Sequence, residues 1–237
     1  MRGRPIGSAI CALALAVACS ARAQERGSES RSAPARPVPM RPAVFFSESW
    51  KPLPTPPDDH NAWPASPAGV ASPNLELKLY GPSGQAIQLV AGRPPSDATP
   101  TNLWTGSTTS PSAAALRDRA NVVDLSGPLA KIRWVVRTSG FHQARPILKI
   151  ADGTWLVGDH ASGTPADFNE SEISIAEVRW LKLDIDRVVT VGNWIDHPDL
   201  TRVDEIGFAD LMPGSGHGPG GYINVGRISV YGKAVKR

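Results

Sequence analysis

Polar and aromatic side chains that could recognise a ligand gather between residues 139 and 160. An indole can stack on the apolar face of a pyranose, while charged groups hold its hydroxyls or acidic substituents. These residue types therefore predict an exposed site for a polysaccharide or oligosaccharide. With one indole from a later segment, the predicted ligand-binding residues are His142, Arg145, Lys149, Asp152, Trp155, Asp159, His160 and Trp180.

Two other interpretations of the same residues stay open. In a structural interpretation, Trp155 packs in the core and Asp152 makes a turn. In an enzyme, an acid and a base must reach one reacting bond. His142 with Arg145 would suit a polysaccharide lyase, and Asp159 with Asp196 would suit a glycoside hydrolase. The sequence contains no nucleophile elbow, P-loop or dinucleotide-binding pattern, so a non-catalytic role is preferred.

A second polar stretch runs from residue 193 to 199 and is followed by Asp210 and His217. Carboxylates and imidazoles in loops can bind a metal, but the ligand spacing of a zinc site is missing. We expect no cofactor and no catalytic metal. A structural calcium stays possible, because carboxylates and loop carbonyls suit that ion.

The elements that must position these groups are β-strands. Residues 146–150 and 154–157 predict a hairpin across the Asp152-Gly153 turn. Residues 203–208 and 223–232 alternate apolar and polar side chains around a glycine-rich loop, which places Ile206, Phe208, Ile228 and Val230 in a core. Further strands are predicted at 75–80, 86–90, 121–125, 131–137 and 177–185, and one short helix at 112–119.

The strand at 131–137 predicts two different faces. Ile132, Trp134 and Val136 should face the core, and the arginines between them should face outward. If the neighbouring strands keep this register, one exposed cationic face would favour acidic glycans. Its members would be Arg133, Arg137, Lys149, Trp180 and Lys182.

The chain begins like an exported protein. Arg2 and Arg4 precede an apolar run at 6–18 and a small-residue cleavage site before Gln24, as in a signal peptide. The run is too short to span a bilayer, so we expect a secreted or periplasmic protein without a transmembrane segment. A lipid anchor at Cys19 is the minority alternative.

Removing the three arginines of residues 1–23 from 25 basic residues leaves 22, equal to the 22 acidic residues. A neutral mature chain does not predict nucleic acid as a partner. Both cysteines, Cys11 and Cys19, also lie within the signal. A domain of about 200 residues can bury a full core without disulfides.

The organisation predicted along the chain is simple. Residues 1–23 form the signal, 24–42 a disordered linker rich in Ser, Arg, Ala and Pro, and 43–237 a single β-sandwich domain. Within that domain, residues 44–73 are rich in proline and aromatic residues and should wrap over the sandwich without regular ladders. Turn spacing suggests about eight to ten strands.

Several segments carry a resemblance to known proteins. KIRWVVR at 131–137, EVRWLKLD at 177–184, and the closing VDEIGF and INVGRISVYGK resemble galactose-binding-like jelly rolls found among carbohydrate-binding modules. LKIADGTWLVGDH and VDEIGFADLMPGSGHG look like an uncharacterised family of secreted bacterial proteins. The resemblance implies an all-β antiparallel β-sandwich that binds glycans on a concave face or at loop tips. The E-x-D-x-x-E strand of one glycosidase group and the motifs of jelly-roll alginate lyases are absent.

The sequence therefore predicts a secreted, non-catalytic carbohydrate-binding protein of the bacterial envelope or exterior. The first alternative is a carbohydrate-active enzyme, for which His142, Arg145 and Asp159 would be the catalytic residues to test. The second is a structural or partner-binding envelope protein, which the linker at 24–42 would suit.

Overall fold

The computed structural model describes residues 41–54, 61–91, 96, 98–163, 166–212 and 220–237, all within the unit Pro39–Arg237. The predicted signal peptide, both cysteines, most of the linker, His217 and most of the glycine-rich loop lie outside the described residues.

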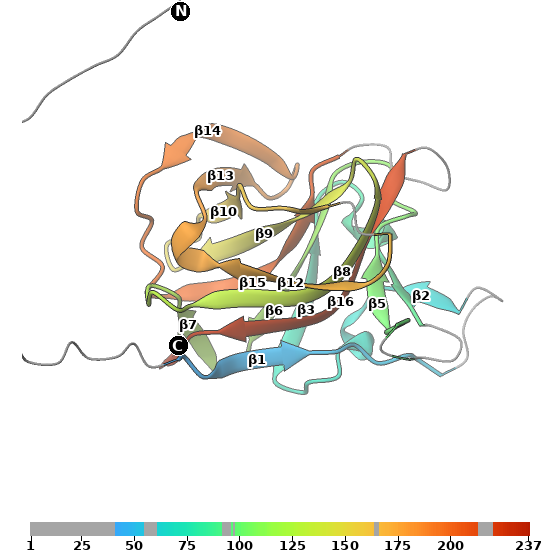
Figure 1. The fold of residues 1–237 in the computed structure, drawn as a ribbon, viewed down its shortest axis with the longest axis horizontal. Coiled ribbons are helices and arrows are strands. Elements are labelled where there is room, and N and C mark those ends of the chain that lie inside the picture. The colour runs from blue at the N-terminus through green and yellow to red at the C-terminus, as the bar shows by residue number, and fades with distance from the viewer. Residues whose placement is uncertain (1–40, 55–60, 92–95, 97, 164–165, 213–219) are drawn as a thin grey trace, which may run out of the picture. The chain divides into compact units, whose positions relative to one another are not determined.

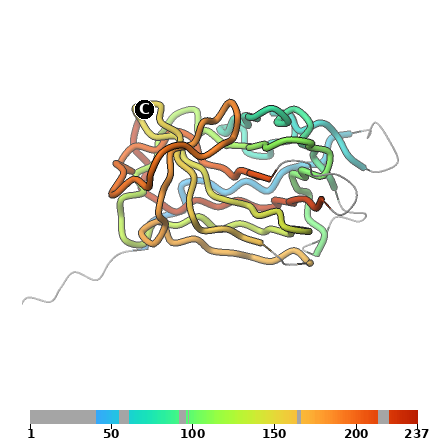
Figure 2. The backbone as a smooth tube through the Cα atoms, turned by 90° about the horizontal axis from the view of Figure 1, so that it is seen from above, coloured from blue at the N-terminus to red at the C-terminus, as the bar shows by residue number. Residues whose placement is uncertain are grey.

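Two antiparallel sheets form a sandwich (Figure 1). The smaller, seven-stranded sheet has the order β12-β8-β16-β5-β4-β2, and β1 pairs with the free length of β16. Figure 2 shows β1 in light blue beside β16 in red, so an early and a late strand are neighbours. The strands are β1 (Val44–Glu48), β2 (Ala62–Pro64), β4 (Gln88–Val90), β5 (Asn102–Trp104), β8 (Lys131–Gly140), β12 (Asn169–Ser174) and β16 (Gly221–Tyr231).

The ten-stranded sheet has the order β14-β13-β10-β9-β15-β6-β3, with β7, β11 and β17 attached to it. Its edge strand β14 lies at the top of Figure 1. The strands are β3 (Leu75–Tyr80), β6 (Ser112–Asp118), β7 (Asn121–Asp124), β9 (Gln143–Ile150), β10 (Trp155–Gly158), β11 (Ser162–Gly163), β13 (Trp180–Asp184), β14 (Val189–Ile195), β15 (Val203–Asp210) and β17 (Lys233–Lys236).

The chain passes from one sheet to the other repeatedly, for example between β5 and β6, between β8 and β9, and between β15 and β16. This winding and the antiparallel pairing confirm the predicted jelly-roll sandwich, although its strands are more numerous than expected. The helices described are three short 3₁₀ turns, η1 (Pro67–Gly69), η2 (Gly84–Ala86) and η3 (Ile175–Glu177). In the described part of the chain, no helix has the length and hydropathy needed to cross a bilayer.

A large hydrophobic core fills the space between the sheets. The predicted inward residues of β8 are buried, and so are Ile206 and Phe208 of β15 and Ile228 and Val230 of β16. The face assignments made from alternation are therefore confirmed for these three strands. The hairpin of β9 and β10 across Asp152-Gly153 is confirmed as well.

A second, smaller core lies on the other face of the ten-stranded sheet, where Trp155 and Val157 pack with Ala113, Ala115 and Val188. Val188 reaches this core from the turn between β13 and β14 and contacts Gly81 after β3. A Cβ at Gly81 would lie 2.4 Å from a methyl carbon of Val188 and 2.8 Å from the Pro111 carbonyl oxygen. The sheet therefore curls until its two ends touch.

The predicted helix at 112–119 is wrong, because these residues form strand β6 between β3 and β15. Both faces of β6 are buried: Ala114 and Leu116 face the large core, and Ala113 and Ala115 face the small one. Small side chains fit where a strand is covered on both sides. The proline-rich segment also differs from the prediction, since β1 pairs with β16 and β2 pairs with β4.

Candidate functional site

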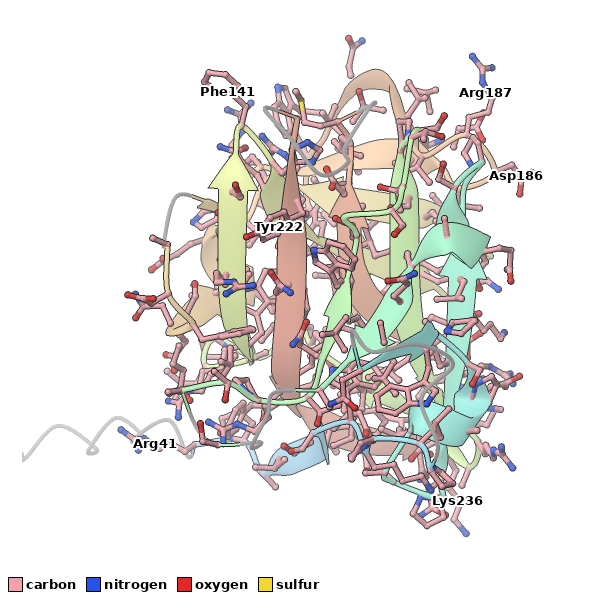
Figure 3. The ribbon with its side chains drawn as sticks, turned by 90° about the vertical axis from the view of Figure 1, so that its right-hand side faces the viewer. Arg41, Phe141, Asp186, Arg187, Tyr222 and Lys236 are labelled. Carbon is pink, nitrogen blue, oxygen red and sulfur yellow. The ribbon has the colours of Figure 1, made fainter. Side chains whose placement is uncertain are left out.

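A row of aromatic and polar side chains crosses the outer face of the seven-stranded sheet. Arg137 of β8 pairs in register with Asn224 of β16, which pairs with Trp104 of β5. Phe168, just before β12, lies on the other side of Arg137. Tyr222 lies two positions from Asn224 and so on the same face. Figure 3 shows Tyr222 on the β16 ribbon, in the face turned to the viewer.

Trp104, Arg137, Phe168 and Tyr222 form the aromatic–arginine platform. The guanidinium carbon of Arg137 lies 5.0 Å from the ring centre of Phe168 and 5.6 Å from that of Tyr222. The Tyr222 ring meets the Trp104 indole edge to face, with ring centres 6.0 Å apart. All four side chains are half-buried, so each keeps part of its surface open to solvent.

Two buried amides support the platform from below. Asn224 donates from Nδ2 to Oδ1 of Asn102 at 2.7 Å, and Asn102 donates to the Pro100 carbonyl at 2.9 Å. These bonds turn the Asn224 oxygen toward Arg137, whose Nε donates to it at 3.2 Å. A Cβ at residue 106 would lie 1.9 Å from the Trp104 ring, so glycine is required there for the indole to lie against the backbone.

The other cations near the platform are paired with carboxylates. Arg133 lies 2.7 Å from Glu172 and 3.3 Å from Glu170, which also accepts Arg227 at 2.6 Å. Hydrogen bonds from Lys131 and Arg133 lower the pKa of Glu172. Glu170 and Glu172 are therefore committed to ion pairs and do not form a free acid–base couple.

Three of the predicted ligand-binding residues are buried. His142, Trp155 and Trp180 have exposed fractions of 1%, 7% and 2%, so they present no surface on which a glycan could lie. The indoles of Trp155 and Trp180 contribute to the two cores. The structural interpretation was right for Trp155, and the exposure predicted for His142, Trp155 and Trp180 is wrong.

The other members of the predicted cluster have local structural partners. Asp152 accepts the backbone N–H of Thr154 at 2.8 Å in the turn, and this bond lowers its pKa. Arg145 donates to the carbonyl of Asp159 at 3.1 Å. Asp159 accepts from His160 and from the N–H of Arg179; burial would raise its pKa, but these bonds lower it.

Lys149 belongs to a cluster that the sequence did not reveal. The carboxylate of Glu205 is fully buried and lies 3.1 Å from Lys149 Nζ and 3.0 Å from Lys78 Nζ. The Tyr80 hydroxyl donates to its second oxygen at 2.5 Å. Burial, followed by this contact with Glu205, raises the pKa of Tyr80 strongly. The cluster neutralises a buried charge, and Glu205 is too enclosed to meet a substrate.

His142 forms a buried pair with Asp210, with Nδ1 and Oδ2 2.7 Å apart. Thr105 donates to the same oxygen at 3.2 Å and accepts the N–H of Ile223. Burial raises the pKa of Asp210 against the opposing effect of His142. The pair joins the ends of β15 and β16 to the turn after β8. At 1% exposure and bonded to Asp210, the His142 ring presents no open surface to a substrate.

The predicted cationic face is also corrected. Arg133 and Arg137 face outward as expected, but they belong to the seven-stranded sheet. Lys149 and Lys182 belong to the ten-stranded sheet, and Trp180 lies in the core between the sheets. Alternation alone placed the arginines correctly, whereas their neighbours depended on how distant strands pair.

The second polar stretch borders a cavity of about 370 Å³ beside β14. Asp196 and His197 line it together with Glu177, Arg179 and the edge of Trp180. Across the described ranges, no three His, Cys, Asp or Glu side chains lie close enough to hold a metal ion. The structural calcium that the sequence left open therefore lacks a cluster of side-chain ligands in those ranges.

Sequence reasoning missed Trp104, Phe168 and Tyr222 as site residues. A signal for one of them existed, because alternation from Ile223 and Val225 places Tyr222 and Asn224 on the outer face. Phe168 and Trp104 carry no comparable signal. They join the platform only because β12 and β5 flank β8 and β16 in the sheet.

Comparison with known proteins gives no family assignment. No protein-family model and no curated protein matches the chain. Among solved structures, a family 11 carbohydrate-binding module of the cellulosomal cellulase Lic26A-Cel5E of Clostridium thermocellum matches with a TM-score of 0.37 and 13% identity, covering 78% of this chain and 88% of that one. The same family's module from Clostridium thermocellum, in complex with a β-1,3-1,4-mixed-linked tetrasaccharide, gives 0.34 and 14%, covering 78% and 96%.

An exo-β-agarase matches with a TM-score of 0.35 and 10% identity over 70% of this chain and 24% of that one. Two of these three structures are carbohydrate-binding modules, the class that the sequence resembles. Likenesses this distant assign neither a ligand nor an activity, and the chain is similar to these proteins only in its arrangement of strands.

Proposed function

We propose that the protein is a secreted, non-catalytic carbohydrate-binding protein whose ligand lies across the aromatic–arginine platform. The observation that carries this proposal is the half-exposed set of Trp104, Tyr222 and Phe168 around a fixed guanidinium on one sheet face. Aromatic rings stack on the apolar faces of sugars, and a guanidinium donates hydrogen bonds to their oxygens. A preorganised site loses little side-chain entropy when it binds.

The absence of catalysis is part of the proposal. The carboxylates beside the platform are held in ion pairs, and His142 and Glu205 are buried at 1% and 0% exposure. Binding without turnover therefore fits the described geometry better than the alternatives of a lyase or a glycoside hydrolase.

Affinity electrophoresis and calorimetry against a panel of neutral and acidic polysaccharides test this function. Trp104→Ala and Tyr222→Ala should each weaken binding about tenfold, because each removes a stacking surface. Trp194→Ala is the matched control, since Trp194 is 41% exposed and also stacks on an arginine, Arg179, but lies on the other sheet.

The site would lie elsewhere if both platform variants bound every polysaccharide as tightly as the wild type. It would also lie elsewhere if only the Trp194 variant lost binding. Release of reducing ends or unsaturated products would show catalysis instead of simple binding. If the protein neither binds nor cleaves any polysaccharide of the panel, a structural or partner-binding role would be the better account.

Export is proposed from the sequence alone. We expect the protein made in a bacterial host to be recovered outside the cytoplasm with Gln24 as its first residue. Intact mass measurement checks this, and a mass increase that disappears in a Cys19→Ser variant would establish the lipid-anchored alternative.

A further inference from the structure

Arg137 differs from the other cations on its face. Lys131, Arg133 and Arg227 each lie within 3.3 Å of Glu170 or Glu172. The guanidinium of Arg137 has no carboxylate partner among the described residues, and its only hydrogen bond there runs from Nε to the Asn224 amide oxygen. Within the described part of the chain it is therefore a positive charge without a counter-charge.

The surroundings of Arg137 prepare it to bind an anion. Phe168 and Tyr222 stack against the guanidinium, and the amide chain through Asn224 and Asn102 holds Nε. The terminal nitrogens Nη1 and Nη2 are left without a partner in the described structure. Two parallel N–H donors at this end of an arginine match the two oxygens of a carboxylate.

The Asn224 amide carries no charge, its oxygen accepts from Arg137, and one of its N–H groups donates to Asn102. The anion must therefore meet the arginine itself. An uncharged sugar would leave this half-buried guanidinium without a counter-charge, whereas a uronic acid would place its ring on the aromatic side chains and its carboxylate on Arg137. The affinity for the uronic acid should be much higher than the affinity for the uncharged sugar, because hydrogen bonds between charged groups are the strongest of their kind.

Resting on the proposed function, we propose that the aromatic–arginine platform selects uronic acid residues, with Arg137 binding the sugar carboxylate. Arg133 provides an internal comparison. It lies on the same strand and face and near another tyrosine, Tyr231 at 5.7 Å, yet Glu170 and Glu172 neutralise it. Only the unneutralised arginine should select the acid.

Calorimetry should compare oligosaccharides of polygalacturonate, alginate and glucuronan with their carboxyl-reduced counterparts, which keep the rings and lose the charge. The wild-type protein should bind at least one acidic chain about tenfold or more tightly than its reduced form. Arg137→Gln should remove this preference by lowering the affinity for the acidic chain far more than the affinity for the reduced form. Arg133→Gln should keep the preference.

Equal affinity for acidic and reduced chains in the wild-type protein would overturn the selection of uronates and leave carbohydrate binding intact. An equal loss in both arginine variants would also overturn it, because a general positive face would then explain the preference. Failure to bind any saccharide, acidic or neutral, would overturn the proposed function as well. Thermal unfolding verifies the fold of each variant. Arg137→Lys keeps the positive charge but loses the two parallel N–H donors of the guanidinium, so it should retain only part of the preference for the acidic chain.

Discussion

Buried charges in this protein are surrounded by donors. Glu205 is held by two lysines and a tyrosine, and Glu48 by three backbone N–H groups. A carboxylate taken out of water is tolerated only when it is paired and hydrogen-bonded. Arg137 departs from this pattern, because it is half-buried and its charge lacks a partner in the described residues. That contrast within one molecule is the reason for proposing Arg137 as the residue that binds an anion.

Glu205→Gln should lower the free energy of unfolding by about 2–4 kcal/mol, because it leaves two lysines beside an uncharged amide. Equilibrium unfolding in urea measures the loss. Glu172→Gln is the control, since its carboxylate is largely exposed and should contribute about 1 kcal/mol or less. Similar losses in both variants would show that burial of Glu205 adds nothing to its ion pairs.

Trp134→Ala should lower the free energy of unfolding by about 3–5 kcal/mol. The indole is 1% exposed between the sheets, and its N–H donates to Ser162 at 2.9 Å. Urea unfolding again gives the value, with the exposed Trp194→Ala expected within about 0.5 kcal/mol of the wild type. A loss below about 1 kcal/mol for Trp134→Ala would contradict its place in the core.

At the scale of elements, Trp50, just after β1, stabilises a β-bulge in β16. The register of β16 against β8 shifts between Val225 and Ile228. The Trp50 indole N–H donates to the carbonyls of Val225 and Gly226 there, at 3.0 and 2.7 Å. Trp50 itself has a positive φ of 45°, and Glu48 accepts its backbone N–H at 2.9 Å. Glu48 thus fixes Trp50, whose indole N–H donates to the backbone carbonyls at the bulge.

Glu48→Ala should release this segment, because three backbone N–H groups lose a charged acceptor at once. We expect amide exchange of Trp50, Ala71 and Ser72 to become at least about tenfold faster, a change that hydrogen-exchange mass spectrometry or NMR can measure. Glu76→Ala, which removes a half-exposed carboxylate from β3, should leave these amides unchanged. Unchanged exchange after Glu48→Ala would show that other contacts hold the segment.

At the scale of the whole molecule, ion pairs spread over the surface make the free energy of unfolding depend on pH. Burial opposes ionisation of Asp204, but hydrogen bonds from Arg237 and Arg117 outweigh it and lower the pKa. Hydrogen bonds also lower the pKa values of Glu172, Asp152, Asp159 and Asp199. Asp210, with its raised pKa, has the opposite sign and offsets part of their effect.

A carboxylate whose pKa is lower in the folded state stabilises the fold above its unfolded pKa, and this contribution is lost as pH falls through the folded value. The unfolded values are near 3.8 for Asp and 4.5 for Glu. The free energy of unfolding should therefore fall below about pH 4.5, as urea midpoints measured from pH 7 to pH 3 would show. Asp204→Asn should make this fall shallower, and a flat profile in the wild type would contradict the assignment.

Much of the fold could be predicted from the sequence, because side-chain alternation is a local property of each strand. It placed Trp134, Phe208 and Val230 in the core and Arg137 outside. It failed at residues 112–119, where alanines are compatible with a helix and only burial between β3 and β15 makes them a strand. Local preference is weak, and tertiary packing overrides it.

The candidate site could be predicted only in part. Sequence alone determined that arginines of β8 face outward and that the chain forms a β-sandwich rich in tryptophan. The tertiary structure decided that Trp155 and Trp180 are buried and that Trp104, Phe168 and Tyr222 surround Arg137. These residues come from separate strands, and their meeting depends on strand order and register, which are set by packing across the whole sheet.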